Sequence, residues 1–212
     1  MSYIKYIFLI LLSILLYFKN TNKFYKNIKD VKKPYKLDTL VNKNNKLNKY
    51  YRPYDLVKIS ESFSNKNKYL RYEACKNFEK LANDAEKLGY RIIAVSTYRS
   101  YFYQKELYNH YLKTLGKIAD NASARPGHSE HQLGLSVDVE GSNFDYNKFE
   151  KTPEFKWMIN NSYKYGFILR YPKGKEHITG FKYEPWHYRY VGVKLAKIIH
   201  DKEITLEEYK KD

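Results

Sequence analysis

The stretch SEHQLGLSVDVE, residues 129–140, decides the fold because its second half alternates apolar and polar side chains. Successive side chains of a β-strand point to opposite faces, so the alternation predicts a strand with one apolar face toward a core. The residues on that face are Leu135, Val137 and Val139. Asp138 lies on the other face, which points into a cleft or into solvent.

Two residues of this stretch are of the type that binds metal ions. His131 precedes Asp138 by seven residues, and a turn at Gly134 would fold the imidazole back beside the carboxylate. A histidine and a carboxylate are two ligands suited to zinc. Taken alone the pair is weak evidence, because an exposed loop histidine is the ordinary interpretation of such a residue.

A second motif, EPWH at residues 184–187, supplies the other half of a site. Glu184 and His187 are three residues apart, so an extended chain would place them on opposite faces. A turn at Pro185 is therefore needed for both to reach one centre. With His187 as a third ligand, a zinc ion would keep an open position for water. Glu184 would then be placed as the general base for that water.

Local signals place helices and further strands around the two motifs. The strands are predicted at YRIIAVSTYRS (90–100), FILRYP (167–172) and WHYRYVG (186–192). Ser100 and Thr152 are typical helix N-caps, and TLEE at 205–208 is a capping box. Helices are expected after each of these, over 70–88, and from Val193 onward. Helices mixed with strands, and an antiparallel strand pair late in the chain, predict an α+β fold.

The N-terminal part of the chain differs from the rest in composition. Residues 1–19 hold an uncharged apolar run from Tyr6 to Phe18, which predicts a signal-anchor or a cleaved signal peptide. This places the protein outside the cytoplasm, tethered to the cell membrane or secreted to the cell wall. Residues 20–49 are rich in Lys and Asn and predict a solvated basic tether, followed by the catalytic domain at 50–212. Deleting residues 20–49 is expected to weaken association with a charged surface in a salt-dependent way and to leave catalysis unchanged.

The formal charge of +16 is unevenly distributed. Residues 1–50 carry eleven Lys against two Asp, so a surplus of nine positive charges lies outside the predicted catalytic domain. Nucleic-acid binding by that domain is therefore not expected. Since the charge directly follows an apolar segment, anionic lipid or wall polymer is the expected partner. The chain has a single cysteine, Cys75, so no intramolecular disulfide can form. Cys75 falls within the helix expected over 70–88 and is expected to pack next to the apolar stripe of that helix.

The two motifs resemble those of the VanY-type zinc D-alanyl-D-alanine carboxypeptidases. SEHQLGLSVD is similar to the family's S-x-H-x-x-G-x-A-x-D signature, and EPWH is similar to its E-x-W-H motif. Further matches, such as STYRSYFYQ at 96–104, extend the resemblance over about residues 40–212. The resemblance implies a small central antiparallel sheet flanked by helices, the hedgehog and D-Ala-D-Ala-peptidase fold. Ser136 and Thr97 depart from the family's usual Ala and Gly without removing a ligand.

The resemblance also implies roles for particular residues. The implied ligands of Zn²⁺ are His131, Asp138 and His187. Glu184 would be the catalytic base, and Arg99 would polarise the scissile carbonyl. Ser129 would contact the substrate, and Gln104 would lie in the same cleft. The implied substrate is a peptidoglycan stem peptide ending in D-Ala-D-Ala, which loses its terminal D-Ala. A D,D-dipeptidase, an endopeptidase or a non-catalytic wall-binding domain are the alternatives.

Overall fold

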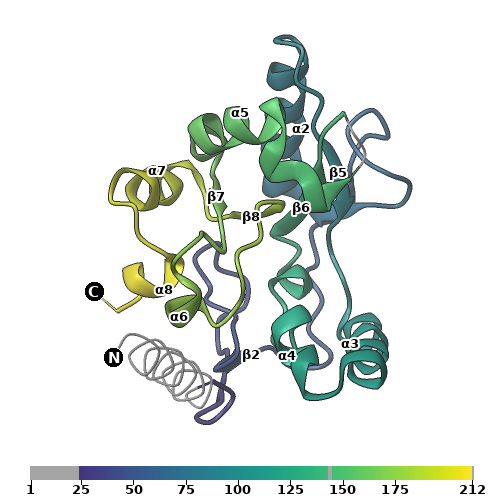
Figure 1. The fold of residues 1–212 in the computed structure, drawn as a ribbon, viewed down its shortest axis with the longest axis vertical. Coiled ribbons are helices and arrows are strands. Elements are labelled where there is room, and N and C mark those ends of the chain that lie inside the picture. The colour runs from purple at the N-terminus through teal and green to yellow at the C-terminus, as the bar shows by residue number, and fades with distance from the viewer. Residues whose placement is uncertain (1–23, 143–144, 212) are drawn as a thin grey trace, which may run out of the picture.

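The computed structural model describes residues 24–142 and 145–211 of the chain (Figure 1). Its centre is a four-stranded sheet with the strand order β5-β6-β8-β7, in which every neighbouring pair is antiparallel. The strands are β5 (Ile93–Ser96), β6 (Ser136–Glu140), β7 (Phe167–Leu169) and β8 (His187–Tyr190). The predicted small antiparallel sheet is therefore confirmed.

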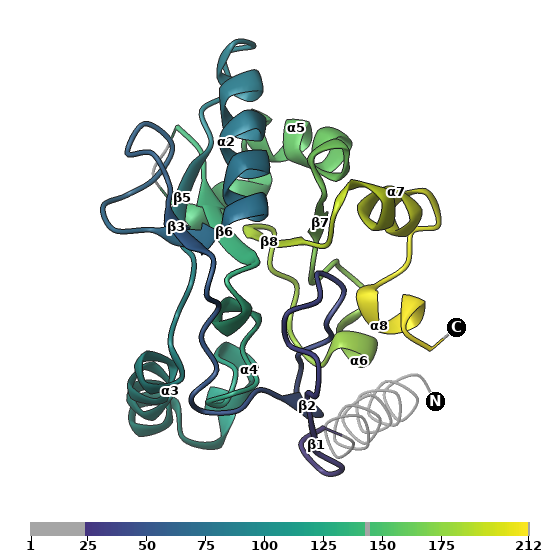
Figure 2. The same ribbon diagram turned by 180° about the vertical axis from the view of Figure 1, so that it is seen from behind.

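Helices surround this sheet, which confirms the α+β prediction. They are α2 (Tyr72–Glu86), α3 (Tyr101–Leu115), α4 (Ala119–Ala122), α5 (Pro153–Asn161), α6 (Glu176–Thr179), α7 (Val193–Asp201) and α8 (Leu206–Tyr209). Helices α2 and α5 lie at one end of the molecule, α3 and α4 lie at the other, and α7 and α8 follow the β7 side (Figures 1 and 2). Two smaller strand pairs complete the fold: β1 (Lys29–Asp30) with β2 (Asn45–Lys46), and β3 (Leu56–Lys58) with β4 (Tyr69–Arg71).

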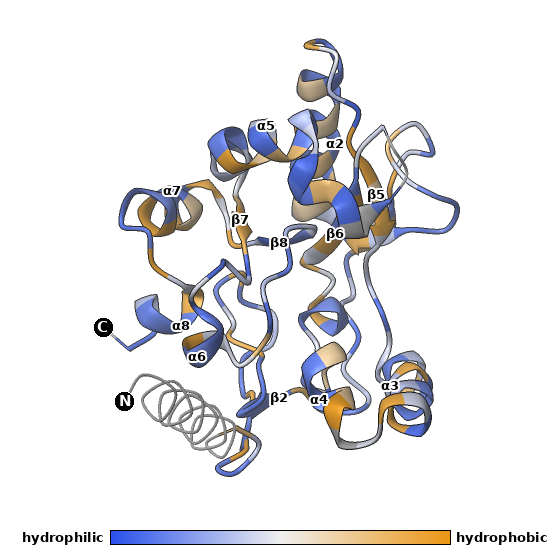
Figure 3. Cartoon of the chain, viewed as in Figure 1, coloured by the Kyte–Doolittle hydropathy of each residue, from blue (hydrophilic) through white to orange (hydrophobic). Residues whose placement is uncertain are grey.

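The apolar face of β6 forms the centre of the core. The three alternating residues predicted to face inward, Leu135, Val137 and Val139, are fully buried. Phe78 and Leu81 of α2 belong to the same buried cluster. Burying each such side chain contributes roughly 1.5–3 kcal/mol. The apolar colouring of β5 and β6 in Figure 3 marks this region.

The helix starts are fixed by the side chains that the sequence indicated. The hydroxyl of Ser100 accepts from the backbone N–H of Tyr103, and the hydroxyl of Thr152 accepts from that of Phe155. The capping box at the start of α8 is also formed. Each cap satisfies an N–H that has no partner inside its helix. The Ser100 cap matters most for the site, because it starts α3 directly after Arg99.

Residues 24–49 differ from the expected solvated tether, because they are folded onto the domain. Val41 and Leu47 are buried in the main core, and β1 pairs with β2 within the segment. The Arg189 guanidinium donates to the backbone carbonyls of Leu37 and Thr39, at 2.8 and 3.0 Å. Buried donors of the domain thus find their acceptors on this segment. The folded domain therefore includes residues 24–49, which the sequence had assigned to the tether.

The predicted signal-anchor at residues 1–19 lies outside the described residues. Within the described part of the chain, no helix is both long enough and apolar enough to cross a membrane.

Candidate metal centre and active-site cleft

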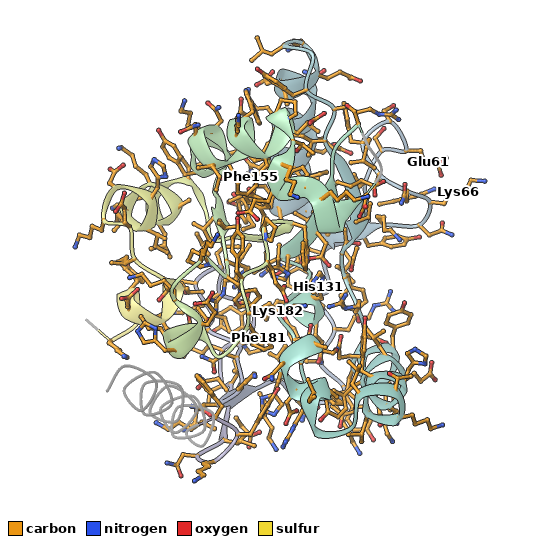
Figure 4. All side chains as sticks on the ribbon, viewed as in Figure 1. Glu61, Lys66, His131, Phe155, Phe181 and Lys182 are labelled. Carbon is orange, nitrogen blue, oxygen red and sulfur yellow. The ribbon has the colours of Figure 1, made fainter. Side chains whose placement is uncertain are left out.

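The two motifs meet in a cleft of about 810 Å³. Residues of β5, β6 and β8 line its floor, and one side of α3 forms a wall. The α3 residues on that wall are Tyr103, Leu107, Tyr111 and Leu115. Figure 4 shows His131 near the middle of the molecule, with Phe181 and Lys182, which also line the cleft, close to it.

The three predicted ligands lie together in this cleft. One ligand atom from each of His131, Asp138 and His187 lies within 4.8 Å of the others. The register of β6 with β8 places Asp138 directly opposite His187, so the sheet itself sets this pair. A short 3-10 helix, Glu130–Leu133, carries His131 and ends at Gly134, whose φ of 67° reverses the chain into β6. The predicted turn at Gly134 is confirmed.

The hydrogen bonds of His131 leave its Nε2 free to bind a cation. Its Nδ1 lies 2.7 Å from the carbonyl oxygen of Thr97, which can only accept, so Nδ1 carries the proton. Burial, with the nearby charge of Arg99, lowers the pKa of His131 to about 4 and keeps the ring neutral. The unprotonated Nε2 then faces Asp138 Oδ2 at 3.3 Å. Two lone pairs this close repel each other, and a cation between them would relieve the repulsion. The site therefore fits a metal ion.

His187 is held by carboxylates. Its Nδ1 lies 2.9 Å from Asp138 Oδ1 and 3.8 Å from Glu184 Oε2. Burial alone would lower the pKa of His187, but its contacts with Asp138 and Glu130 raise it to about 9. The surrounding charge is therefore negative, which favours a bound cation.

Glu184 is placed as the sequence predicted. The chain turns at Pro185 and Trp186, and the N–H of His187 donates to the carbonyl of Glu184 at 3.2 Å. This turn brings both residues of EPWH to the cleft. Burial is the main cause that raises the pKa of Glu184 to about 7. A carboxyl group with a pKa near neutrality can both accept and release a proton at neutral pH.

Arg99 and Ser129 also reach the cleft, whereas Gln104 does not. Arg99 Nη1 donates to Ser96 Oγ at 2.9 Å and lies 3.9 Å from Asp138 Oδ2. Ser129 is buried against the cleft, and no described residue hydrogen bonds to its hydroxyl. The Gln104 amide instead donates inside the protein, to Ser123 Oγ and to the Ala124 carbonyl. The prediction that Gln104 lies in the cleft is therefore wrong. Its side chain instead holds Ser123 and Ala124, which line the cleft.

Sequence reasoning missed a buried group of charges next to the ligands. Glu130 Oε1 accepts from Arg170 Nε and from Arg189 Nη1, both at 2.8 Å. Arg170 also forms a two-bond pair with Glu207 of α8, at 2.7 and 2.8 Å. Burial opposes the ionisation of Glu130, but the two guanidinium groups outweigh it and lower its pKa. The signal in the sequence was an arginine in each of two segments that were predicted as strands and are rich in apolar or aromatic residues, FILRYP and WHYRYVG.

Two histidines and one aspartate around a gap suited to one cation, with a buried glutamate beside them, are typical of a mononuclear metal-dependent hydrolase. Comparison with known proteins agrees with this class. The family model of VanY, D-alanyl-D-alanine carboxypeptidase, matches residues 67–193. The chain therefore belongs to the VanY family and is a peptidase.

Two relatives extend the likeness beyond the matched region. The putative carboxypeptidase YodJ of Bacillus subtilis (strain 168) is 43% identical over 201 residues, which are 91% of this chain and 73% of the relative. The bifunctional D-Ala-D-Ala dipeptidase and D-Ala-D-Ala carboxypeptidase VanXYC of Enterococcus gallinarum is 39% identical over 176 residues, which are 80% of this chain and 91% of the relative.

Solved structures of similar proteins confirm the fold. The LdcB LD-carboxypeptidase superposes with a TM-score of 0.83 at 43% identity, covering 88% of this chain and 91% of its own. VanYB in complex with D-alanine-D-alanine has a TM-score of 0.71 at 33% identity, covering 82% and 97%. A VanY mutant from the VanB-type resistance cassette, in complex with Zn(II), has a TM-score of 0.70 at 32% identity, covering 81% and 97%. The small sheet flanked by helices is thus the D-Ala-D-Ala-peptidase fold.

Proposed function

We propose that the chain is a zinc-dependent carboxypeptidase that releases one terminal D-alanine from peptidoglycan stem peptides. The observation that carries the proposal is the unprotonated Nε2 of His131 facing the Asp138 carboxylate, with His187 beside them. The donor set of two imidazoles and one carboxylate suits zinc. The similar VanY mutant in complex with Zn(II) supports the same choice of metal.

Three residues of the cleft have separate roles in the proposed reaction. Zinc, when bound, would polarise the scissile carbonyl and make water more acidic. Glu184 takes the proton of the attacking water and passes it to the amine of the departing D-alanine, as its pKa near 7 allows. Arg99 donates to the carbonyl oxygen as negative charge develops there. The free hydroxyl of Ser129 hydrogen bonds to the peptide.

The bond between two D-alanines is the first candidate for cleavage. The similar VanYB is solved in complex with D-alanine-D-alanine, and the matching family model is that of a D-alanyl-D-alanine carboxypeptidase. An L,D bond is the second candidate, because LdcB has both a higher identity and a higher TM-score than VanYB. Both candidates use the same groups and differ only in which residue precedes the scissile bond.

Digestion of defined peptides separates these candidates. The full chain, loaded with zinc, is incubated with a stem pentapeptide, a stem tetrapeptide, D-Ala-D-Ala and a cross-linked muropeptide, and the products are identified by mass. Loss of one D-Ala from the pentapeptide indicates D,D-carboxypeptidase activity, and loss of one from the tetrapeptide indicates L,D activity. Cleavage of only the dipeptide or only the cross-link would replace the proposal by a dipeptidase or an endopeptidase. No cleavage by folded, zinc-loaded protein would contradict it and favour a wall-binding role.

We also propose that residues 1–19 hold the domain at the outer side of the cytoplasmic membrane, where peptidoglycan lies. The folded segment still exposes seven lysines, and five of them lie in its first half and can contact anionic lipid or wall polymer: Lys26, Lys29, Lys32, Lys33 and Lys36. Protease added to protoplasts should degrade the domain. Replacing the five lysines by serine should weaken co-sedimentation with anionic vesicles at low salt, and unchanged binding would contradict this contact.

A further inference from the structure

Glu130 lies at the second ring nitrogen of the candidate ligand His187. Its side chain is fully buried, and its Oε1 accepts hydrogen bonds from Arg170 and Arg189. Among the residues that the structure describes, its Oε2 has no hydrogen-bond partner, and neither has the buried Nε2 of His187. These two atoms lie 3.8 Å apart. Two buried polar atoms thus face each other just beyond hydrogen-bond distance.

This pairing has a simple chemical reason once a metal occupies the site. When Nδ1 of a neutral imidazole binds a metal, the ring proton must reside on Nε2, which is then a donor. An ionised carboxylate can only accept, so Glu130 Oε2 is the complementary partner. An unmet buried donor or acceptor costs about 1–3 kcal/mol. A shift of less than an ångström would satisfy both atoms.

We propose that Glu130 is a positioning residue that orients His187 with Nδ1 toward the metal. It does not touch the substrate in this role, and it acts through the imidazole. A carboxylate behind a ligand histidine fixes the tautomer and the ring orientation and strengthens the ligand. The inference rests on the proposed metal site, but it concerns how tightly that site holds its ion.

The position of Glu130 is itself fixed from two distant parts of the chain. Arg170 lies between Glu130 and Glu207, so the carboxylate is linked to the C-terminal helix α8. Arg189 links it to residues 37–39 through their backbone carbonyls. Both guanidinium groups hold Oε1, which leaves Oε2 directed at His187. Segments near both ends of the described chain therefore help to hold the Glu130 carboxylate beside the candidate ligand His187.

The test compares two variants of the full chain that each remove a buried carboxylate from Arg170. Glu130→Gln alters the group that faces His187, whereas Glu207→Gln, the matched control, does not. Zinc affinity is measured by competition with a chromophoric chelator. Glu130→Gln should bind zinc about 10–100-fold more weakly than the wild type, and Glu207→Gln should stay within about threefold. The visible spectrum of the Co²⁺-loaded protein should change in Glu130→Gln and remain unchanged in Glu207→Gln.

Two outcomes would overturn the inference: wild-type zinc affinity in Glu130→Gln, or an equal loss in Glu207→Gln. A wild-type chain that binds no metal would instead refute the proposed function. If Glu130→Gln fails to fold, a crystal structure of the zinc-loaded wild type decides. His187 Nε2 should then lie about 2.7–3.2 Å from Glu130 Oε2. A separation that stays near 3.8 Å would contradict the positioning role.

Discussion

Asp138 is the residue around which the site is organised. Its Oδ2 faces His131 and its Oδ1 faces His187, so each carboxylate oxygen contacts one imidazole. Burial alone would raise the pKa of Asp138, but the two histidines lower it well below its ordinary value. The carboxylate is therefore ionised at neutral pH and available to a metal. A single side chain thereby couples both motifs.

Glu184 gives the first prediction at this scale. Glu184→Gln keeps the size of the side chain but removes its ability to accept a proton. We expect kcat to fall about 10²–10⁴-fold while the zinc content stays at the wild-type level, because Glu184 is not a ligand. Steady-state kinetics on the cleaved stem peptide, with metal analysis of the same sample, checks both. A near-normal kcat would show that another group is the base.

Arg99 gives a second prediction. Arg99→Met keeps much of the side-chain length but removes the donors directed into the cleft. We expect kcat to fall about 10²–10³-fold, the effect of losing one donor to a developing oxyanion. Arg52→Met, which removes an exposed guanidinium outside this cleft, is the matched control and should leave kcat unchanged. A loss confined to KM would contradict the role of Arg99 in the transition state.

The candidate ligands could be predicted because two ordered motifs together resemble those of the VanY family, although the pair of His131 and Asp138 alone was weak evidence. Glu130 was not predicted, although it stands next to His131, because its partners are 40, 57 and 59 residues away in the chain. Only the fold brings them together. The prediction for Gln104 was wrong because the sequence does not show where a side chain points. Gln104 lies near the cleft in sequence terms, but its amide is directed into the protein.

The element that decides the site is the turn between the 3-10 helix Glu130–Leu133 and β6. Gly134 adopts a φ of 67°, and a Cβ there would lie 2.8 Å from Leu56 Cδ2 and 3.2 Å from Arg71 Cγ. A side chain at this position would therefore meet both backbone strain and a clash. Because the turn separates two candidate ligands, any shift would also move His131 relative to Asp138.

Gly134→Ala should destabilise the protein more than strain alone explains. We expect a loss of about 2–4 kcal/mol in the free energy of unfolding, measured by chemical denaturation. Gly89→Ala is the matched control, because its φ of 83° is also positive but a Cβ there meets no atom within 4 Å. That control should lose only about 1–2 kcal/mol. Equal losses in both variants would contradict the close packing at Gly134.

Element types could be predicted better than their surroundings. The caps of α3 and α5 and the capping box of α8 are formed as the sequence indicated. However, Gln104 is the only residue of α3 that is buried, and the leucines of this helix line the cleft or are exposed. Periodicity identifies an apolar side of a helix, but it does not say whether that side meets a core or a cleft.

At the scale of the whole molecule, the main surprise is residues 24–49. Their Lys- and Asn-rich composition predicts a solvated segment, yet their backbone carbonyls accept hydrogen bonds from buried donors of the domain. The His128 ring donates to the carbonyl of Asn42, and the Gln132 amide donates to that of Asn48. Backbone acceptors are present in every sequence, so this kind of packing leaves no trace in composition or periodicity.

Deleting residues 24–49 should therefore destabilise the domain, contrary to the expectation from sequence. The deletion exposes the surface that Val41 and Leu47 cover, at roughly 1.5–3 kcal/mol for each side chain, and leaves Arg189 without two acceptors. We expect a lower unfolding temperature and loss of activity. Replacing the exposed Lys26, Lys29 and Lys33 by serine is the control and should change neither the unfolding temperature nor the activity. An active, equally stable deletion variant would show that the segment is dispensable.

The central claim is that the folded chain holds one zinc ion at His131, Asp138 and His187. Its most direct test is the zinc content of purified, dialysed full chain and its variants by elemental analysis. We predict one zinc per chain in the wild type and in Glu184→Gln, and almost none in His131→Ala, Asp138→Ala or His187→Ala that remain folded. Ligand variants that retain stoichiometric zinc, or a wild type that binds none, would contradict the account.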